Sequence, residues 1–95
     1  YVPNDTVNIG RYVIIAMMAL EKNIALASAF GKHVRAIRKG RGMSMQALAD
    51  EINVEFRQIA RIESGEVNTS LQMAAAIAKV FGMTLAELFD FEWEA

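Results

Sequence analysis

The sequence predicts an all-α protein, with a compact core of five short helices preceded by an additional apolar segment. Apolar residues recur at helical spacings of three and four along most of the 95 residues. Serine, threonine and glycine stand where helices would begin and end. The composition is 54% hydrophobic with one proline, Pro3, which is too apolar for a disordered chain and permits long helices.

The charges nearly cancel, but they are unevenly distributed along the chain. Ten basic and eleven acidic residues give a net charge of −1. Residues 32–61 carry seven basic and three acidic side chains, whereas residues 62–95 carry one basic and six acidic side chains. The middle of the chain is therefore basic by +4 and the C-terminal third acidic by −5. This placement bears more on a nucleic-acid partner than the net charge does.

Several classes of function are disfavoured by residues that are missing or isolated. The chain has no cysteine, which excludes disulfides, thiolate metal sites and cysteine nucleophiles and fits a cytoplasmic protein. The longest apolar run, residues 13–20, is far shorter than the roughly 20 residues of a membrane helix. His33 is the sole histidine, and we expect it to be exposed and inert. We therefore predict no enzyme activity, no metal or other cofactor, no membrane association and no evident small-molecule ligand.

The first element is an apolar segment after a polar terminus of eight residues. We expect a helix over Ile9–Lys22, capped by Asn8, although the β-branched stretch Tyr12–Ile15 also permits a short strand. One helical face carries an apolar stripe with spacings of 4, 3, 4 and 3: Val13, Met17, Leu20, Ile24 and Ala27. Residues 1–27 are therefore assigned to an N-terminal extension. Dimerisation is expected through this segment, through the last helix, or through both.

The core is predicted to begin with a helix over Ala25–Lys39. Phe30, Val34 and Ile37 form its inner stripe, since they follow the helical period. The two glycines at 40 and 42 end it, because glycine readily adopts the left-handed conformation that closes helices.

The next two predicted helices meet at a sharp turn. Ser44 caps a short helix that runs to about Ile52, Asn53 and Val54 break it, and a second helix runs from Glu55 to Ser64, with Gly65 as terminator. Ala49 is small enough for a close approach of the two helices. Their crossing angle is set by four apolar residues: Leu48, Val54, Ile59 and Ile62. This pattern is typical of a helix-turn-helix, whose second helix enters the DNA major groove.

The C-terminal third completes the set of helices. Asn68 or Thr69 is expected to cap a helix over Ser70–Phe81, which Gly82 ends. Thr84 and Glu87 match a capping box that starts a last short helix through Phe89. Residues 91–95 form an acidic tail. Its aromatic residues, Phe91 and Trp93, either cover the domain or mark a surface for a partner.

The segment from about Phe30 to Phe89 resembles the lambda-repressor-like family, of the Cro/C1 or XRE type. The resemblance rests on an ordered set of residues: Ile37-Arg38, Ser44, Leu48-Ala49, Val54, Ile59, Arg61 to Gly65, Ile77 to Lys79, Phe81-Gly82 and Leu85 to Phe89. It covers roughly 60 of the 95 residues. The family's five-helix DNA-binding domain is thereby implied for residues 28–90.

The resemblance also implies roles for individual side chains. Base edges would be contacted by Phe56, Arg57 and Arg61. Phosphates would be contacted by Ser44, Gln46, Gln58, Lys39 and Arg41. Arg38 and Glu63 would form a partly buried ion pair that joins the first core helix to the recognition helix.

The function implied is sequence-specific binding of double-stranded DNA by a small homodimeric transcriptional regulator. An alternative is a protein–protein interaction module that keeps the helix-turn-helix fold without binding DNA. Three features favour the alternative: the negative net charge, the acidic tail, and departures from the family pattern. Met45 stands where many members have a DNA-contacting glutamine, and Glu55 stands where serine or threonine is commoner. Thr69 replaces a usual proline, which is a minor change because threonine is itself a good cap.

Overall fold

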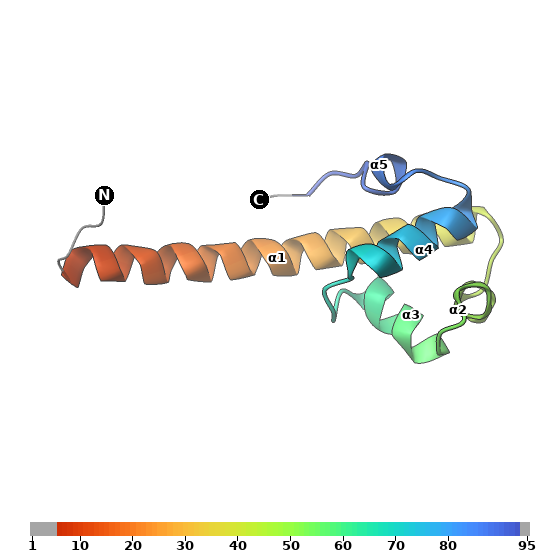
Figure 1. Ribbon diagram of the computed structural model, residues 1–95, viewed down its shortest axis with the longest axis horizontal. Coiled ribbons are helices and arrows are strands. Elements are labelled where there is room, and N and C mark those ends of the chain that lie inside the picture. The colour runs from red at the N-terminus through yellow and green to blue at the C-terminus, as the bar shows by residue number, and fades with distance from the viewer. Residues whose placement is uncertain (1–5, 94–95) are drawn as a thin grey trace.

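The computed structural model describes the backbone of residues 6–93 and the side chains of residues 13, 14 and 24–93. Within residues 6–93 the chain is helical, with connecting loops and no strand (Figure 1). The helices are α1 (Thr6–Gly40), α2 (Met45–Ile52), α3 (Phe56–Ser64), α4 (Leu71–Phe81) and α5 (Leu85–Leu88). The predicted all-α fold is confirmed.

Helix α1 is one continuous helix of 35 residues. The prediction of two helices, Ile9–Lys22 and Ala25–Lys39, is therefore wrong, as is the alternative of a strand near Tyr12. Asn23 and Ile24, at the expected junction, are neither proline nor glycine, so no backbone feature interrupts the hydrogen-bond ladder. Asn8 lies inside the helix and is not its cap.

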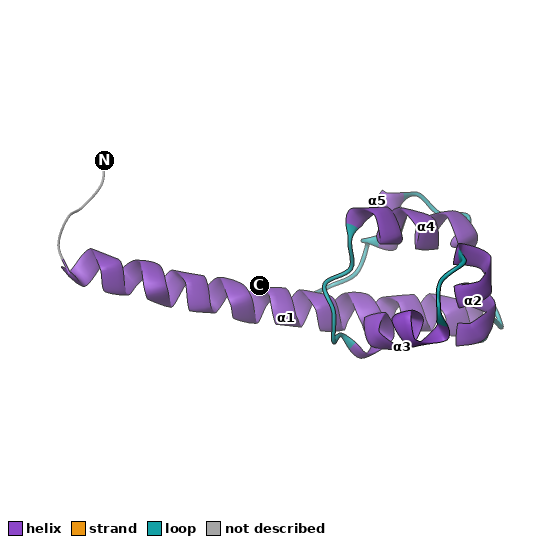
Figure 2. Cartoon of the chain, turned by 60° about the horizontal axis from the view of Figure 1, so that its bottom comes forward, coloured by secondary structure: helices purple, strands orange, loops and turns teal. Residues whose placement is uncertain are grey.

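About half of α1 projects beyond the other four helices (Figures 1 and 2). The described chain accordingly measures 55 × 24 × 19 Å. The C-terminal half of α1 packs into a core built from all five helices. Its buried side chains are Phe30, Val34, Leu48, Ala49, Ile59, Ile62, Ala74, Ile77, Ala78, Phe81 and Leu88. Of the predicted inner stripe of α1, Phe30 and Val34 are buried and Ile37 is partly buried. In the part of the chain that the structure describes, no helix has the combination of length and apolar character needed to span a membrane.

Side-chain caps fix the starts of three helices. The Ser44 hydroxyl accepts a hydrogen bond from the Ala47 N–H at 3.0 Å, as a cap of α2 should. Ser70 caps α4 by accepting from the Met73 N–H at 3.0 Å, so the prediction of Asn68 or Thr69 as cap is wrong by one or two residues. Asn68 and Thr69 stand one or two residues before this cap, so their side chains would have to reach further to accept a hydrogen bond from the Met73 N–H.

The predicted capping box of α5 is present. The backbone N–H of Thr84 donates to Glu87 Oε1 at 3.0 Å, and the Glu87 N–H donates to Thr84 Oγ1 at 3.1 Å. Both bonds with Thr84 lower the pKa of the Glu87 carboxyl. The bond with the Thr84 backbone has the larger effect, and the bond with its side chain has the smaller one. The capping box therefore stabilises the folded state at pH values above the ordinary pKa of a glutamate. This stabilisation is lost as the pH falls through the lowered pKa of Glu87.

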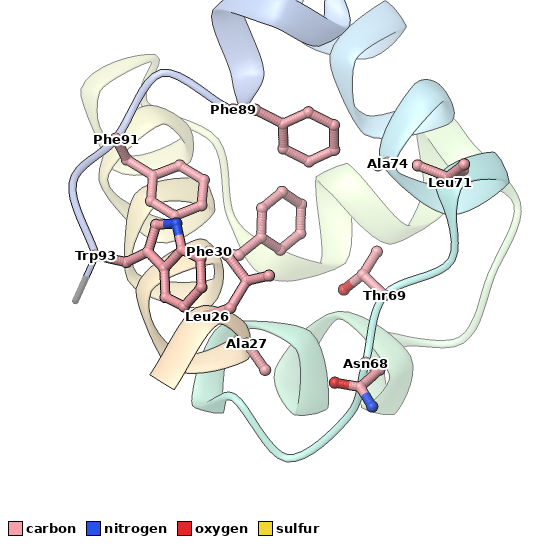
Figure 3. A pocket seen from close by; sticks show the side chains of 10 residues that line it. All are labelled: Leu26, Ala27, Phe30, Asn68, Thr69, Leu71, Ala74, Phe89, Phe91 and Trp93. Carbon is pink, nitrogen blue, oxygen red and sulfur yellow. The ribbon is translucent and has the colours of Figure 1, made fainter. Parts of the chain in front are cut away.

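The C-terminal tail folds back over α1 (Figure 3). The Phe91 ring lies 6.2 Å from the Phe30 ring and 5.1 Å from the His33 ring. The expectation of an exposed His33 is therefore wrong, because the tail half-buries the imidazole and its Nε2 atom has no hydrogen-bond partner in the described structure. Phe91 thus covers the domain. It also lines, together with Trp93, an open pocket of about 510 Å³ between α1, the loop before α4, the first turns of α4 and the tail.

Two glycines let α1 and the end of α3 approach closely. A Cβ atom on Gly31 of α1 would lie only 2.3 Å from the Ile62 carbonyl oxygen and 2.7 Å from that of Glu63. A Cβ atom on Gly65, which ends α3 at a φ of +78°, would lie 2.8 Å from the Cα atom of Ser28. Backbone thus packs against backbone at this crossing, and no larger residue fits without moving one of the helices.

We predict that Gly31→Ala destabilises the fold by about 1–3 kcal/mol, the usual cost of overpacking a tight contact. Gly40→Ala is the matched control, because a Cβ atom on this last residue of α1 would have no neighbour within 4 Å. Loss of backbone freedom in the unfolded chain should make the control neutral or stabilising by a few tenths of a kcal/mol. Urea unfolding measures both, and equal midpoints for the two variants would contradict the close contact.

Candidate nucleic-acid interface

The turn between α2 and α3 sets their crossing. Asn53 follows α2 in the left-handed conformation, with φ at +64°, which asparagine tolerates better than most residues. The Val54 N–H then donates to the Ala49 carbonyl at 3.0 Å and closes the end of α2. Ala49 is fully buried. The break predicted at Asn53 and Val54 is confirmed, and it leaves only three residues between the two helices.

Helix α3 turns one face to the core and the opposite face to solvent. Ile59 and Ile62 are buried, whereas Arg57 and Arg61 are exposed. Four residues correspond to about 40° of rotation beyond a full turn, so the two arginines share the outer face. In the described part of the chain neither guanidinium forms an ion pair, so both are available to an external anion. Phe56, the third predicted base-contacting residue, is 44% exposed in the first turn of α3.

Arg38 connects α3 to two other segments from the inside. Its Nε atom donates to Glu63 Oε2 at 2.7 Å and its Nη2 atom to Glu63 Oε1 at 2.9 Å. The third bond runs from Nη1 to the Met43 carbonyl at 2.8 Å. One guanidinium thus holds the end of α1, the turn before α2 and the inner side of α3.

The surroundings of this pair favour its charged form. The two side chains are only 7% and 5% exposed. The hydrogen bonds to Glu63 raise the pKa of Arg38, and the burial that opposes them is the smaller effect. The hydrogen bonds thus favour the cationic guanidinium, and their bidentate geometry offsets part of the cost of removing both charges from water.

The predicted phosphate-contacting residues lie on three segments around α3. Lys39 and Arg41 are exposed at the end of α1, and the Arg41 guanidinium sits 5.6 Å from the centre of the Phe81 ring. Ser44 is the cap of α2, while Gln46 in its first turn donates to Asp50 Oδ1 at 2.8 Å. Gln58 is exposed in the first turns of α3. The end of α1, α2 and the start of α3 gather at one end of the molecule (Figure 1).

Two departures from the family pattern have different consequences. Met45 is half-buried and packs against the core, so it replaces a polar contact with an apolar one. Glu55 is the exposed N-cap of α3 and makes no side-chain capping bond. Its negative charge suits the helix dipole but repels a phosphate at the same place.

Some residues that position this site from behind were not predicted from the sequence. Gly31 and the carbonyl of Met43 help to hold α3 without a functional side chain, and neither was named. Gly65 was predicted as the terminator of α3, which is confirmed, but its close contact with α1 was not predicted. The run of small residues Ala27, Ser28 and Gly31, at helical spacing, was the available signal for the close helix crossing. The carbonyl of Met43 left no signal, since any residue supplies that oxygen.

Comparisons with known proteins match this geometry. A family model described as helix-turn-helix matches residues 34–88. An uncharacterised HTH-type transcriptional regulator of Archaeoglobus fulgidus is 36% identical over 61 residues, which are 64% of this chain and 87% of that protein. A second, from Methanocaldococcus jannaschii, is 33% identical over 61 residues, 64% of this chain and 88% of that protein.

Solved structures are similar over the same region. The restriction-modification controller protein C.AhdI of Aeromonas hydrophila has a TM-score of 0.63 at 26% identity, with 65% of this chain and 94% of that chain covered. The competence regulator ComR of Streptococcus vestibularis has a TM-score of 0.63 at 33% identity, with 68% of this chain and 22% of that chain covered. The family model begins at Val34, so it leaves out the projecting half of α1.

We predict that Arg38→Met or Glu63→Leu alone lowers the free energy of unfolding by about 3–5 kcal/mol, because each leaves a buried group without its partner. The double variant Arg38→Met/Glu63→Leu should recover a large part of this loss. A double-mutant cycle in urea measures the coupling. Additive losses in the double variant would show that the two side chains do not act as a pair.

Proposed function

The chain belongs to the helix-turn-helix family, of the lambda-repressor-like type that its sequence predicted, and from this membership we propose that it regulates transcription by binding double-stranded DNA. The family is one of regulators, so the protein is not an enzyme. In this proposal residues 28–90 form the DNA-binding domain, residues 1–27 an extension and residues 91–95 a tail. Helix α1 runs across the first of these boundaries.

The observation that carries the proposal is the outer face of α3. Arg57 and Arg61 point to solvent without an acidic partner in the described chain, while Arg38 and Glu63 fix the inner side. In the proposed complex α3 lies in the major groove, where an arginine can donate two hydrogen bonds to guanine O6 and N7. In the same proposed complex the exposed Phe56 contacts a thymine methyl group.

Backbone phosphates are proposed to contact the groups around α3. The first N–H groups of α2 and the Ser44 hydroxyl form the positive end of a helix, where anions bind favourably. Lys39 and Arg41 add two cations, and the amides of Gln46 and Gln58 add hydrogen-bond donors. These contacts orient α3 but carry no sequence information.

The proposed regulator acts as a homodimer. A single module of this size buries only about 600–1,000 Å² on DNA, and two half-sites one helical turn apart let two recognition helices bind one face of the duplex. The proposed site is therefore a palindrome. Selection of bound duplexes from a random pool tests this directly, since enrichment of a palindrome supports both DNA binding and two-fold symmetry.

We predict that Arg57→Ala and Arg61→Ala each weaken binding to the selected duplex by about 1–3 kcal/mol, and that they relax base preference at the positions they contact. Lys79→Ala on α4 is the control, because it removes one exposed positive charge outside the proposed interface. Its effect should be within about 0.5 kcal/mol. Fluorescence anisotropy at fixed salt measures all three variants.

The salt dependence and the removal of a negative charge complete this test. The logarithm of affinity should fall with the logarithm of salt concentration with a slope of about −0.9 per phosphate contact. Glu55→Gln should strengthen binding, since it removes a negative charge from the start of α3. If no duplex is enriched and both arginine variants behave as Lys79→Ala does, the alternative of an interaction module without DNA binding is favoured.

A further inference from the structure

The C-terminal half of α1 carries a row of cations that faces away from the core. Lys32, Arg35 and Lys39 are exposed, and they follow the spacings of three and four residues that keep side chains on one side of a helix. At about 100° per residue, the three lie about 100–180° around α1 from the buried Phe30 and Val34. We call these three exposed residues the basic stripe.

No acidic residue pairs with the basic stripe in the part of the chain whose side chains the structure describes. Residues 22–49 contain no aspartate or glutamate. Glu63 of α3 is bound from the inside by Arg38. Among residues 24–93, neither Lys32 nor Arg35 forms an ion pair. The stripe is therefore a surface of uncompensated positive charge, which favours an anionic partner.

The basic stripe borders the side of α1 on which α3 packs. Gly31 meets the carbonyl oxygen of Ile62 at the end of α3, and Arg35 lies only about 40° around the helix from Gly31. Figure 2 shows α3 beside the C-terminal half of α1, and the two helices bury their inner faces in one core. Their outer faces, with the stripe on α1 and Arg57 and Arg61 on α3, therefore adjoin each other across this contact.

The width of the major groove places the basic stripe at the DNA backbone and not at the bases. Packed helices have axes about 8–10 Å apart, and the tight contact at Gly31 favours the shorter distance for α1 and α3. The major groove is about 12 Å wide, so its phosphate strands run about 6 Å to either side of a helix centred in it. With α3 in the groove, α1 lies beyond the groove edge and its stripe faces one phosphate strand.

We propose that Lys32 and Arg35 bind phosphates of the DNA strand that borders the groove occupied by α3. The proposal rests on the proposed function, and it extends the interface from Lys39 back along α1 by about two turns. Each such contact releases counterions from the duplex and adds affinity that depends on salt. These contacts hold α3 in register on the duplex, but they do not read its sequence.

The salt dependence of binding to the selected duplex measures these contacts. In the double variant Lys32→Ala/Arg35→Ala, the slope of log affinity against log salt should become shallower by about 1.8 for each bound subunit, since each phosphate contact contributes about 0.9. The ratio of wild-type to variant affinity should then be about twelvefold larger at 50 mM than at 200 mM salt for each bound subunit. The sequence selected from a random pool should not change, because phosphate contacts carry no base preference.

Three controls separate a phosphate contact from a loss of charge or of structure. Lys79→Ala removes one exposed positive charge on α4 and should keep the wild-type slope. Arg35→Lys retains the charge and should also keep it. Circular dichroism should show unchanged helix content in the double variant, because both positions are exposed and alanine favours a helix. A double variant whose slope equals that of Lys79→Ala, or whose selected sequence differs from the wild type, would overturn the proposal.

Duplexes that carry a single methylphosphonate linkage locate the contact, because this linkage has no negative charge. At a phosphate bound by the basic stripe, the linkage should weaken binding of the wild type and have little further effect on Lys32→Ala/Arg35→Ala. Lys79→Ala should respond to each linkage as the wild type does. If the losses from the double variant and from the linkage multiply at every phosphate that borders the half-site, the two side chains do not bind there and the proposal is wrong.

These outcomes are separate from those for the proposed function. Weakened binding by Arg57→Ala and Arg61→Ala, with a wild-type slope in Lys32→Ala/Arg35→Ala, would retain the regulator and reject the contact by α1. If no duplex is selected, the same slopes are measured on a duplex of random sequence. A shallower slope of the double variant there would retain the contact by α1 and reject sequence-specific regulation.

Discussion

The bidentate pair between Arg38 and Glu63 is the interaction on which the rest of the site depends. Helix α3 has nine residues and could not persist alone in water. Burial of Ile59 and Ile62 attaches it to the core, but apolar contacts do not by themselves fix its rotation about its own axis. A planar guanidinium that binds both carboxylate oxygens at 2.7 and 2.9 Å does so, because the geometry of the two bonds is specific.

Rotation of α3 decides which side chains face outward. With Glu63 held inward, Arg57 and Arg61 must lie on the opposite side of the same short helix. The distance between α3 and α1 is fixed by the contact of Gly31 with the end of α3. Backbone packs directly against backbone there, so neither helix can move closer to the other. The exposed arginines are therefore positioned by residues that never approach a ligand.

The sequence predicted the helices of the core because their signals are local. Ser44, Gly65, Gly82 and the Thr84–Glu87 pair act within a few residues of where they stand, and the periodic apolar residues report which face is buried. Features that depend on distant segments were missed or wrong. No local signal shows that the tail returns over His33. A break between two helices was predicted near Asn23, although no residue there ends the helix.

The most direct test of the role of this pair follows the arginine side chains by NMR as a selected duplex is added. The Nε–H signals of Arg57 and Arg61 should shift on binding, whereas that of Arg38 should keep the position set by its bonds to Glu63. Shifts confined to α4 and α5, or a large change at Arg38 with none at Arg57 and Arg61, would contradict the claim that a fixed inner pair presents an outer pair to DNA.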